Sequence, residues 1–172
     1  MCNDSRDNFL LCLTLLLAAL VLGCAPVADP GAGMKVADAV ALIEHAPRSS
    51  VTPEAMAEAF ALGTRATNVQ REMLDSKLVG HVVEWDLRVY DVDLADGRLT
   101  VTSRAIPIAD AEAVPLVRVI AFVLPQNEAD DALLRAVKTD DLIRIRGIVQ
   151  EIRLRTVVVI VPAVVITGHA YT

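Results

Sequence analysis

The apolar residues of this chain change their spacing at Leu78. Before it they recur every three or four positions, and after it they recur at every second position. The segment HVVEWDLRVYDV shows the second pattern best, because Val83, Trp85, Leu87 and Val89 alternate with charged or polar residues. A period of two is typical of a β-strand with one buried face. The chain therefore predicts short helices before Leu78, with Thr52 and Thr67 as candidate N-caps, and a sheet after it.

More strand-like segments follow the first one, and a helix interrupts them. Asn127 is a suitable N-cap for a helix that runs through Ala136. The predicted strands after the first cover residues 98–106, 116–124, 142–153 and 157–166. Three strands, a helix and two strands, spread over roughly 90 residues, follow the order of the OB-fold, a small Greek-key barrel.

Two residues in the later strands predict local irregularity. Gly147 lies in the middle of the fourth strand and indicates a bulge or a sharp bend, which would help to curl a small barrel. Pro162 lies in the fifth strand and cannot donate a ladder hydrogen bond. The second half of that strand is therefore expected at a sheet edge or in an irregular stretch.

Two patterned stretches carry a family resemblance. They are Leu78-x-Gly80-x-x-Val83-x-Trp85-x-Leu87-x-Val89, and Leu134-x-x-Val137-Lys138-Thr139-x-Asp141 leading into Ile143-x-Ile145-x-Gly147. Together they resemble OB-like domains of bacterial envelope lipoproteins, akin to the anticodon-binding type of barrel. The resemblance covers residues 78–166 and the helical hairpin before them. It implies a mainly β fold: a five-stranded OB-like Greek-key barrel preceded by two or three short helices.

The N-terminus carries a second resemblance. Residues 9–22 are apolar apart from Thr14, about the length of a signal-peptide core and short of the roughly 20 residues that span a bilayer. Val21-Leu22-Gly23-Cys24 closes this run and resembles the lipobox of bacterial lipoproteins. The resemblance implies cleavage before Cys24 and acylation of Cys24, which would give a stable membrane anchor. An uncleaved anchor, or an ordinary signal peptide with an unrelated cysteine, remains open.

These features predict four parts of the chain. Residues 1–23 are expected to be the lipoprotein signal peptide, and residues 24–34, rich in Pro, Gly and Ala, a flexible tether. A short helical segment would cover 35–77 and the OB-like barrel 78–168. The expected location is the cell envelope, lipid-anchored and facing the periplasm. Ala25, rather than aspartate, follows the cysteine, which favours the outer membrane in a host with two membranes.

Charge and cysteine content limit the possible partners. The chain has a net charge of −6, and the leader carries one net negative charge, so −5 would remain after cleavage. A mildly acidic chain does not suit generic binding to a phosphate backbone. Cys2 and Cys12 would leave with the leader, so Cys24 would remain as an acylated residue with no thiol partner for a disulfide.

The sequence predicts a protein that is not an enzyme and that uses no metal or cofactor. His45, His81 and His169 are dispersed, without the spacing of a metal site. The chain has neither a Gly-x-Ser-x-Gly elbow nor a glycine-rich phosphate loop. The adjacent acidic pairs at 130–131 and 140–141 are interpreted as a complement to a helix dipole and as a solvated turn.

Arginines and one phenylalanine provide the candidate binding residues. OB barrels bind ligands on the face of strands 2–3 and on the loops between strands 1–2 and 4–5. The candidates in these places are Arg104, Arg118, Phe122, Arg153 and Arg155, and Arg144 and Arg146 could extend them into a basic strip. Solvated arginines on the outer face are the simpler interpretation.

Two functions follow from these candidates. The first is a membrane-anchored, non-enzymatic OB-like module that binds an envelope protein or an anionic ligand. The alternative is an OB domain that binds nucleic acid, nucleotide or another anionic polymer through the arginines of strands 2–3. Exposed aromatic residues for base stacking are scarce, which makes nucleic acid an unlikely partner. Arginines paired with Asp or Glu would count against the alternative.

Overall fold

The alternating segment forms β1 (Val82–Ala95), a 14-residue strand, in the computed structural model. The structure describes residues 33–95, 98–109 and 114–166. All of them belong to one unit, Gly31–Thr172. In the first half of β1, Val83, Trp85 and Leu87 are buried and the residues between them are exposed, as the period of two predicts.

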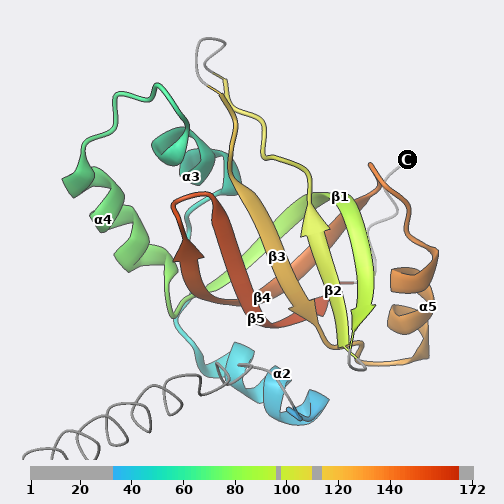
Figure 1. Cartoon of the computed structure of the whole chain (residues 1–172). Helices are drawn as coiled ribbons and strands as arrows, with labels where there is room; N and C mark the ends of the chain where they lie inside the picture. The colour runs from blue at the N-terminus through green and yellow to red at the C-terminus, as the bar shows by residue number, and fades with distance from the viewer. Residues whose placement is uncertain (1–32, 96–97, 110–113, 167–172) are drawn as a thin grey trace, which may run out of the picture. The chain divides into compact units, whose positions relative to one another are not determined.

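The described strands close into a barrel of order β1-β2-β3-β5-β4. The remaining strands are β2 (Arg98–Ser103), β3 (Arg118–Val123), β4 (Leu142–Arg153) and β5 (Val157–Val165). β3 and β5 run parallel, and the other pairs are antiparallel (Figure 1). This confirms the predicted fold class, a mainly β, OB-like barrel with accessory helices.

β1 changes its partner halfway along its length. Residues 82–88 pair with β4, and from Val89 onward the strand pairs with β2. A register shift lies between Val89 and Asp91, so Tyr90 is an extra residue in the β1–β2 ladder. The bulge falls where β1 leaves one neighbour for the other, and among the described strands the second half of β1 therefore pairs with β2 alone.

The interior of the barrel is filled by aliphatic side chains and one indole. Leu87, Val101, Val119, Ile145 and Ile160 are among its buried residues. Trp85 is also buried, and its Nε1–H donates a 3.0 Å hydrogen bond to the carbonyl of Val51, just before α3. The indole thus has its polar atom satisfied and links the barrel to the helical segment.

Gly147 of β4 packs closely against the backbone of Pro162 on β5. A Cβ on Gly147 would lie 2.5 Å from Ile160 Cγ2 and 2.6 Å from the Pro162 carbonyl oxygen. The β4–β5 register shifts between Gly147 and Val149, as the glycine predicts. Pro162 is not at an edge, because β5 pairs on both sides, but the β3–β5 register shifts beside it, between Ala121 and Val123. Of the two expectations for Pro162, irregularity is correct and the edge is wrong.

Among the described residues, three helices precede the barrel and one lies between β3 and β4. They are α2 (Val36–His45), α3 (Pro53–Phe60), α4 (Asn68–Leu78) and α5 (Glu128–Ala136). Thr52 and Asn127 cap α3 and α5 with their side chains, and Thr67 forms a capping box with Gln70 at α4. All three caps agree with the sequence prediction.

The helices cover different parts of the barrel (Figure 1). α2 lies on the outside, where its Ile43 clusters with Val82 and Val164. Met56 and Phe60 of α3 and Leu78 of α4 join the main core. Leu134 of α5 also enters that core and brings the α5–β4 loop against the middle of β1. This last contact positions the candidate site.

Several predictions concern residues outside the described ranges. They are the signal peptide at 1–23, the lipobox with Cys24, nearly all of the tether, and His169. In the part of the chain that the structure does describe, no helix has the length and apolar character needed to cross a bilayer.

Candidate binding face of the barrel

The outer face of β1, β2 and β3 is the surface on which OB barrels bind ligands. The register places side chains in rows across the three strands. Asp93, Thr100 and Phe122 form one row, and the next row begins at Asp91 and continues through Thr102 to Ile120. These two rows therefore carry acidic residues on β1 and neutral or apolar residues on β2 and β3.

Tyr90 forms the centre of a cluster at one end of this face. Tyr90 is 44% exposed and lies on the outer face of β1, at the bulge between Val89 and Asp91. The guanidinium of Arg104 lies 5.0 Å from the ring centroid, and that of Arg118 lies 5.5 Å from it. Two cations on one aromatic ring make this the part of the face best suited to an anionic or planar group. We call Tyr90, Arg104 and Arg118 the Tyr90 cluster.

Arg104 is already paired with a carboxylate. Its Nε and Nη2 donate to the two carboxylate oxygens of Asp140 at 2.9 and 3.1 Å. This hydrogen bonding raises the pKa of the Arg104 guanidinium and lowers the pKa of the Asp140 carboxyl. An incoming anion would have to compete with Asp140 for Arg104.

The backbone of Asp140 explains how the carboxylate reaches this position. Asp140 has a φ of 74°, a left-handed conformation that aspartate tolerates better than most residues. Its N–H donates to the carbonyl of Val89 at 2.7 Å, and its own carbonyl accepts a 2.9 Å bond from Arg88 Nη1. Thr139 Oγ1 donates to the carbonyl of Tyr90 at 3.0 Å. The α5–β4 loop is thus fixed against the bulge of β1.

A second arginine–aromatic contact lies at the other end of the face. The guanidinium of Arg98 lies 5.4 Å from the ring centroid of Phe122. Phe122 is half-buried, as is Ile120 between it and Arg118 on β3. The two contacts therefore lie at opposite ends of the outer row of β3, with an apolar side chain between them.

The outer face of β1 and β4 is a ladder of ion pairs. Arg144 Nε and Nη2 donate to the Asp86 carboxylate at 2.7 and 2.6 Å. Arg146 Nε and Nη2 donate to Glu84 Oε2 at 3.0 and 2.8 Å. Each arginine stands opposite its acidic partner in the register. The basic strip proposed from the sequence is therefore interrupted here by two carboxylates.

Arg153 and Arg155 lie at the β4–β5 turn, away from Phe122. Arg153 Nε donates to Glu151 Oε1 at 2.7 Å. Thr156, next to Arg155, accepts a 2.8 Å bond from the backbone N–H of Arg118, so the turn adjoins the start of β3. Of the five predicted residues, Arg104 and Arg118 share one aromatic ring. Phe122 lies further along β3, and the structure gives Arg153 a separate acidic partner.

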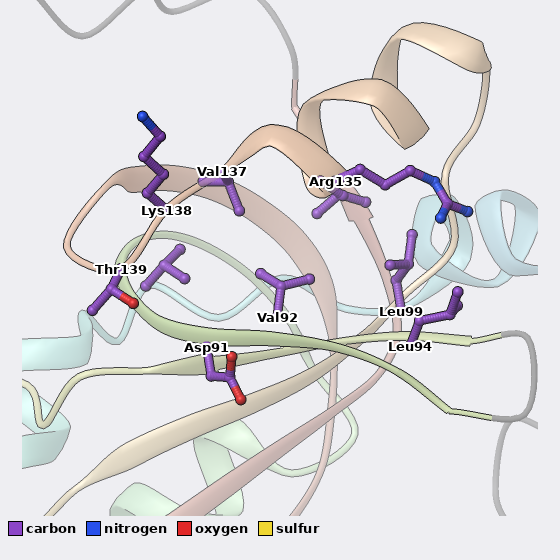
Figure 2. Close-up of a pocket in the computed structure, with 10 residues that line it drawn as sticks. Asp91, Val92, Leu94, Leu99, Arg135, Val137, Lys138 and Thr139 are labelled. Carbon is purple, nitrogen blue, oxygen red and sulfur yellow. The ribbon is translucent and has the colours of Figure 1, made fainter.

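A groove runs between the second half of β1 and α5 (Figure 2). Its volume is about 610 Å³, within the roughly 300–1,000 Å³ of ligand pockets. Val92, Leu134 and Val137 supply apolar lining, and Leu94 at one end is 49% exposed. Lys138 and Arg135 lie on the helix side, where Asp131 pairs with Arg135 at 2.7 Å. The sequence alone does not predict this groove, because the groove depends on how the α5–β4 loop meets β1.

Two polar side chains of the described residues, Ser103 and Asp130, are buried, and each forms hydrogen bonds with the backbone. Ser103 is buried, and its Oγ accepts a 2.8 Å bond from the Val119 N–H and donates to the Arg104 carbonyl. Asp130 is buried at the start of α5 and accepts a 3.0 Å bond from the Gln126 N–H. Within the described ranges, no cluster of three or more His, Cys, Asp or Glu residues could hold a metal ion.

Tyr90 and Asp140 complete the candidate site and were not chosen from the sequence. Alternation places Tyr90 on the outer face of β1, which is a signal that could have found it. Asp140 is 36 residues from Arg104, and only the folded α5–β4 loop brings the two together. The pairing of arginines with carboxylates is the property of this face that separates the two functions considered above.

No protein-family model and no curated protein matches this chain. One solved structure is similar to part of it: a crystal structure described as a "putative nucleic acid-binding lipoprotein" from Klebsiella pneumoniae. The two share 18% sequence identity over 55% of this chain and 77% of the other, with a TM-score of 0.39.

Proposed function

We propose that this chain is a lipid-anchored, non-enzymatic envelope protein whose OB-like barrel is a binding module for another protein. One observation carries the proposal: the arginines on the outer surface of the barrel are largely paired with carboxylates. Arg104, Arg144 and Arg146 each have an Asp or Glu within 3 Å. A surface of alternating charges favours a partner that is itself mixed in charge.

The same pairing weakens the case for a polyanionic ligand. Binding of nucleic acid draws its affinity from cations that neutralise phosphates and release counterions. A guanidinium held by a carboxylate contributes less, because the carboxylate must first be displaced and left without its partner. The net charge of −6 adds long-range repulsion of any polyanion. A protein partner requires neither unpaired cations on this surface nor a net positive charge on the chain.

The proposed anchor rests on the lipobox residues and on the chain that follows them. The eleven residues between Cys24 and α2 can extend to about 40 Å. That length lets an anchored barrel present any of its faces to a neighbouring protein. Acylation at Cys24 would keep the module at the membrane surface, because two or more acyl chains give a stable anchor.

Mass spectrometry of the mature N-terminus tests the anchor. The full chain is expressed in a bacterial host, and its membrane fraction is analysed together with those of Cys24→Ala and Cys12→Ala. We expect an acylated Cys24 at the N-terminus of the wild-type protein and of Cys12→Ala. Cys24→Ala should lose the acyl chains and leave the detergent-extracted membrane fraction. An unmodified Cys24 in a mature membrane-bound protein would overturn the anchor.

Nucleic-acid binding is the second candidate, and the Tyr90 cluster is the observation that favours it. An exposed ring with two guanidinium groups could stack a base and contact a phosphate. Arg118 has no carboxylate partner among the described residues. The candidate predicts salt-sensitive binding of a single strand that is lost in Tyr90→Ala and Arg118→Ala.

Fluorescence anisotropy with a labelled 12-nucleotide oligo-dT separates the two candidates. The protein-binding module predicts dissociation constants no tighter than those of nonspecific binding at physiological salt, which are about 10⁻⁴ to 10⁻⁶ M. The dissociation constants of Arg118→Ala and of the control Arg65→Ala should be equal. Arg65 is exposed on the connection between α3 and α4, away from the Tyr90 cluster. Tight binding that Arg118→Ala abolishes and Arg65→Ala retains would favour nucleic acid instead.

A further inference from the structure

Among the described strands, none covers one edge of the second half of β1. β4 pairs with β1 through residues 82–88, and β2 occupies the other side from Val89 onward. The α5–β4 loop bonds to the carbonyls of Val89 and Tyr90 at the start of this edge. Among the described residues, no hydrogen bond outside the β1–β2 ladder reaches the backbone of residues 91–94.

An uncovered edge presents hydrogen-bonding groups at a fixed spacing. In an antiparallel pair, alternate residues direct their N–H and C=O groups away from the partner strand. Within residues 91–94 those groups point to the side opposite β2, where the groove lies. Natural proteins cover or protect such edges, because they can pair with any extended chain. Here the edge borders a groove with room for a ligand.

The side chains along the edge indicate which residues a ligand strand would need on each of its faces. Val92 and Leu94 line the groove, and Figure 2 shows Val92 directed toward Val137 across it. Asp91 projects to the opposite side of β1, toward the outer face (Figure 2). Asp93 lies on the same face by alternation. Both aspartates are exposed. A strand added to this edge would meet apolar residues on one face and two carboxylates on the other.

We propose that residues 91–94 of β1 bind an extended segment of a partner protein as an added β-strand, with alternating apolar and basic side chains. Apolar residues of the segment would enter the groove beside Val92 and Leu94. Basic residues would stand opposite Asp91 and Asp93, because opposite charges in directly facing positions stabilise a strand pair. The inference deepens the proposed function and rests on it, since it names the partner's chemistry and the surface used.

Charge argues against a second copy of this chain as the occupant. Two copies paired antiparallel through this edge would bring the aspartates of one copy close to those of the other. Like charges in facing positions destabilise a strand pair. Lys138 and Arg135 lie on the helix side of the groove, not along the strand edge, and Arg135 is held by Asp131. The two aspartates therefore disfavour pairing of this edge with a second copy of the chain and favour pairing with a basic segment.

The test uses the full chain in detergent and a fluorescein-labelled amidated peptide of sequence TVKVKVT. Two matched peptides serve as controls. The first has its lysines replaced by glutamates, and the second carries N-methyl groups on alternate residues that block backbone hydrogen bonds and keep every side chain. We expect the lysine peptide to bind, and each control to bind at least about tenfold more weakly, because backbone bonds or favourable charge pairs are lost.

Variants of the chain locate the site. Leu94→Arg should weaken binding of the lysine peptide by about tenfold or more, because it fills the groove and adds a like charge. The control Leu62→Arg replaces another exposed leucine, on the connection between α3 and α4, and should bind as the wild type does. Hydrogen exchange should show new protection of amides within residues 91–94 when the lysine peptide is added.

The outcomes separate this inference from the proposed function. Binding of the glutamate or N-methylated peptide as tight as that of the lysine peptide would overturn the added strand. So would Leu94→Arg with unchanged affinity, or no binding of the lysine peptide at millimolar concentration. None of these results depends on acylation of Cys24 or on oligonucleotide binding, which are the measurements that test the proposed function.

Discussion

Arg104 and Asp140 form a two-bond ion pair that joins the end of β2 to the α5–β4 loop. The bonds are 2.9 and 3.1 Å long, and the same loop residue holds Arg88 through its carbonyl. The pair therefore connects three segments at the place where β1 changes its neighbour. Asp140 also pairs with the guanidinium that OB-type ligand binding would use. The ion pair therefore affects both the order of the loop and the choice of ligand.

The ion pair predicts a specific dependence of stability on pH. The pKa of Asp140 is lowered in the folded state, chiefly by the hydrogen bond from Arg104. Its contribution is therefore complete above the ordinary carboxyl pKa of about 4 and is lost as the pH falls through the lower, folded-state pKa. Asp140→Asn should lower the urea midpoint at pH 7, and its difference from the wild type should shrink by pH 3.

Asp93→Asn is the matched control for that measurement. Asp93 is exposed on the outer face of β1 and has no ion pair with the described residues. Its midpoint should follow the wild type at both pH values. A difference between Asp140→Asn and the wild type that stays constant from pH 7 to pH 3 would contradict the assigned role of the carboxylate.

Ser103 should be more important for stability than its size suggests. Its hydroxyl replaces a ladder bond by accepting from the Val119 N–H at the point where β2 and β3 separate. Ser103→Ala leaves that buried N–H without a partner and should cost about 1–3 kcal/mol in the free energy of unfolding. Urea denaturation followed by circular dichroism measures it. Thr102→Ala, on the outer face of the same strand, should stay within about 0.5 kcal/mol.

The sequence predicted the strands and caps because local patterns determine them. The alternation from Val83 to Val89 fixes the buried face of β1, and the side chains of Thr52, Thr67 and Asn127 cap the helices that follow them. Such signals need no knowledge of the rest of the chain. The fourth strand was predicted with the bounds that the structure has, Leu142–Arg153.

The candidate site was harder to predict because it depends on distant contacts. The sequence places Arg118 on its strand, whereas Arg104, expected inside the second strand, lies just after the end of β2. The sequence gives no sign that both guanidinium groups lie near the Tyr90 ring. The partners of Arg144 and Arg146 are about 60 residues away, at 58 and 62 positions. The β1–β4 register therefore determines which arginines pair with carboxylates on the surface. Spacing along the chain does not reveal that register.

Gly147 should not tolerate even one added methyl group. Its neighbours on β5 include the Pro162 carbonyl oxygen, which belongs to the backbone and cannot turn away. Gly147→Ala should cost about 1–3 kcal/mol in the free energy of unfolding, through a forced shift of β5. The adjacent variant Arg146→Ala removes an ion pair that is partly exposed, and such pairs contribute at most about 1 kcal/mol. Equal urea midpoints for the two variants would contradict the close packing.

Replacement of Leu154 and Arg155 in the β4–β5 turn by Asn-Gly should stabilise the protein. Leu154 and Arg155 occupy the centre of a turn closed by a 3.0 Å bond from the Thr156 N–H to the Arg153 carbonyl, and their φ values are 50° and 60°. Hairpin turns with two positive φ values favour Asn-Gly, because a left-handed residue with a Cβ is strained by about 1–2 kcal/mol. Leu154 is also 91% exposed, so its side chain contributes little packing. The double variant Leu154→Asn/Arg155→Gly should raise the free energy of unfolding by about 1–2 kcal/mol. Urea denaturation measures this change. The control Leu154→Ala retains the backbone strain, and its free energy of unfolding should remain close to that of the wild type. A loss of stability in the double variant would show that contacts of the turn residues outweigh their strain.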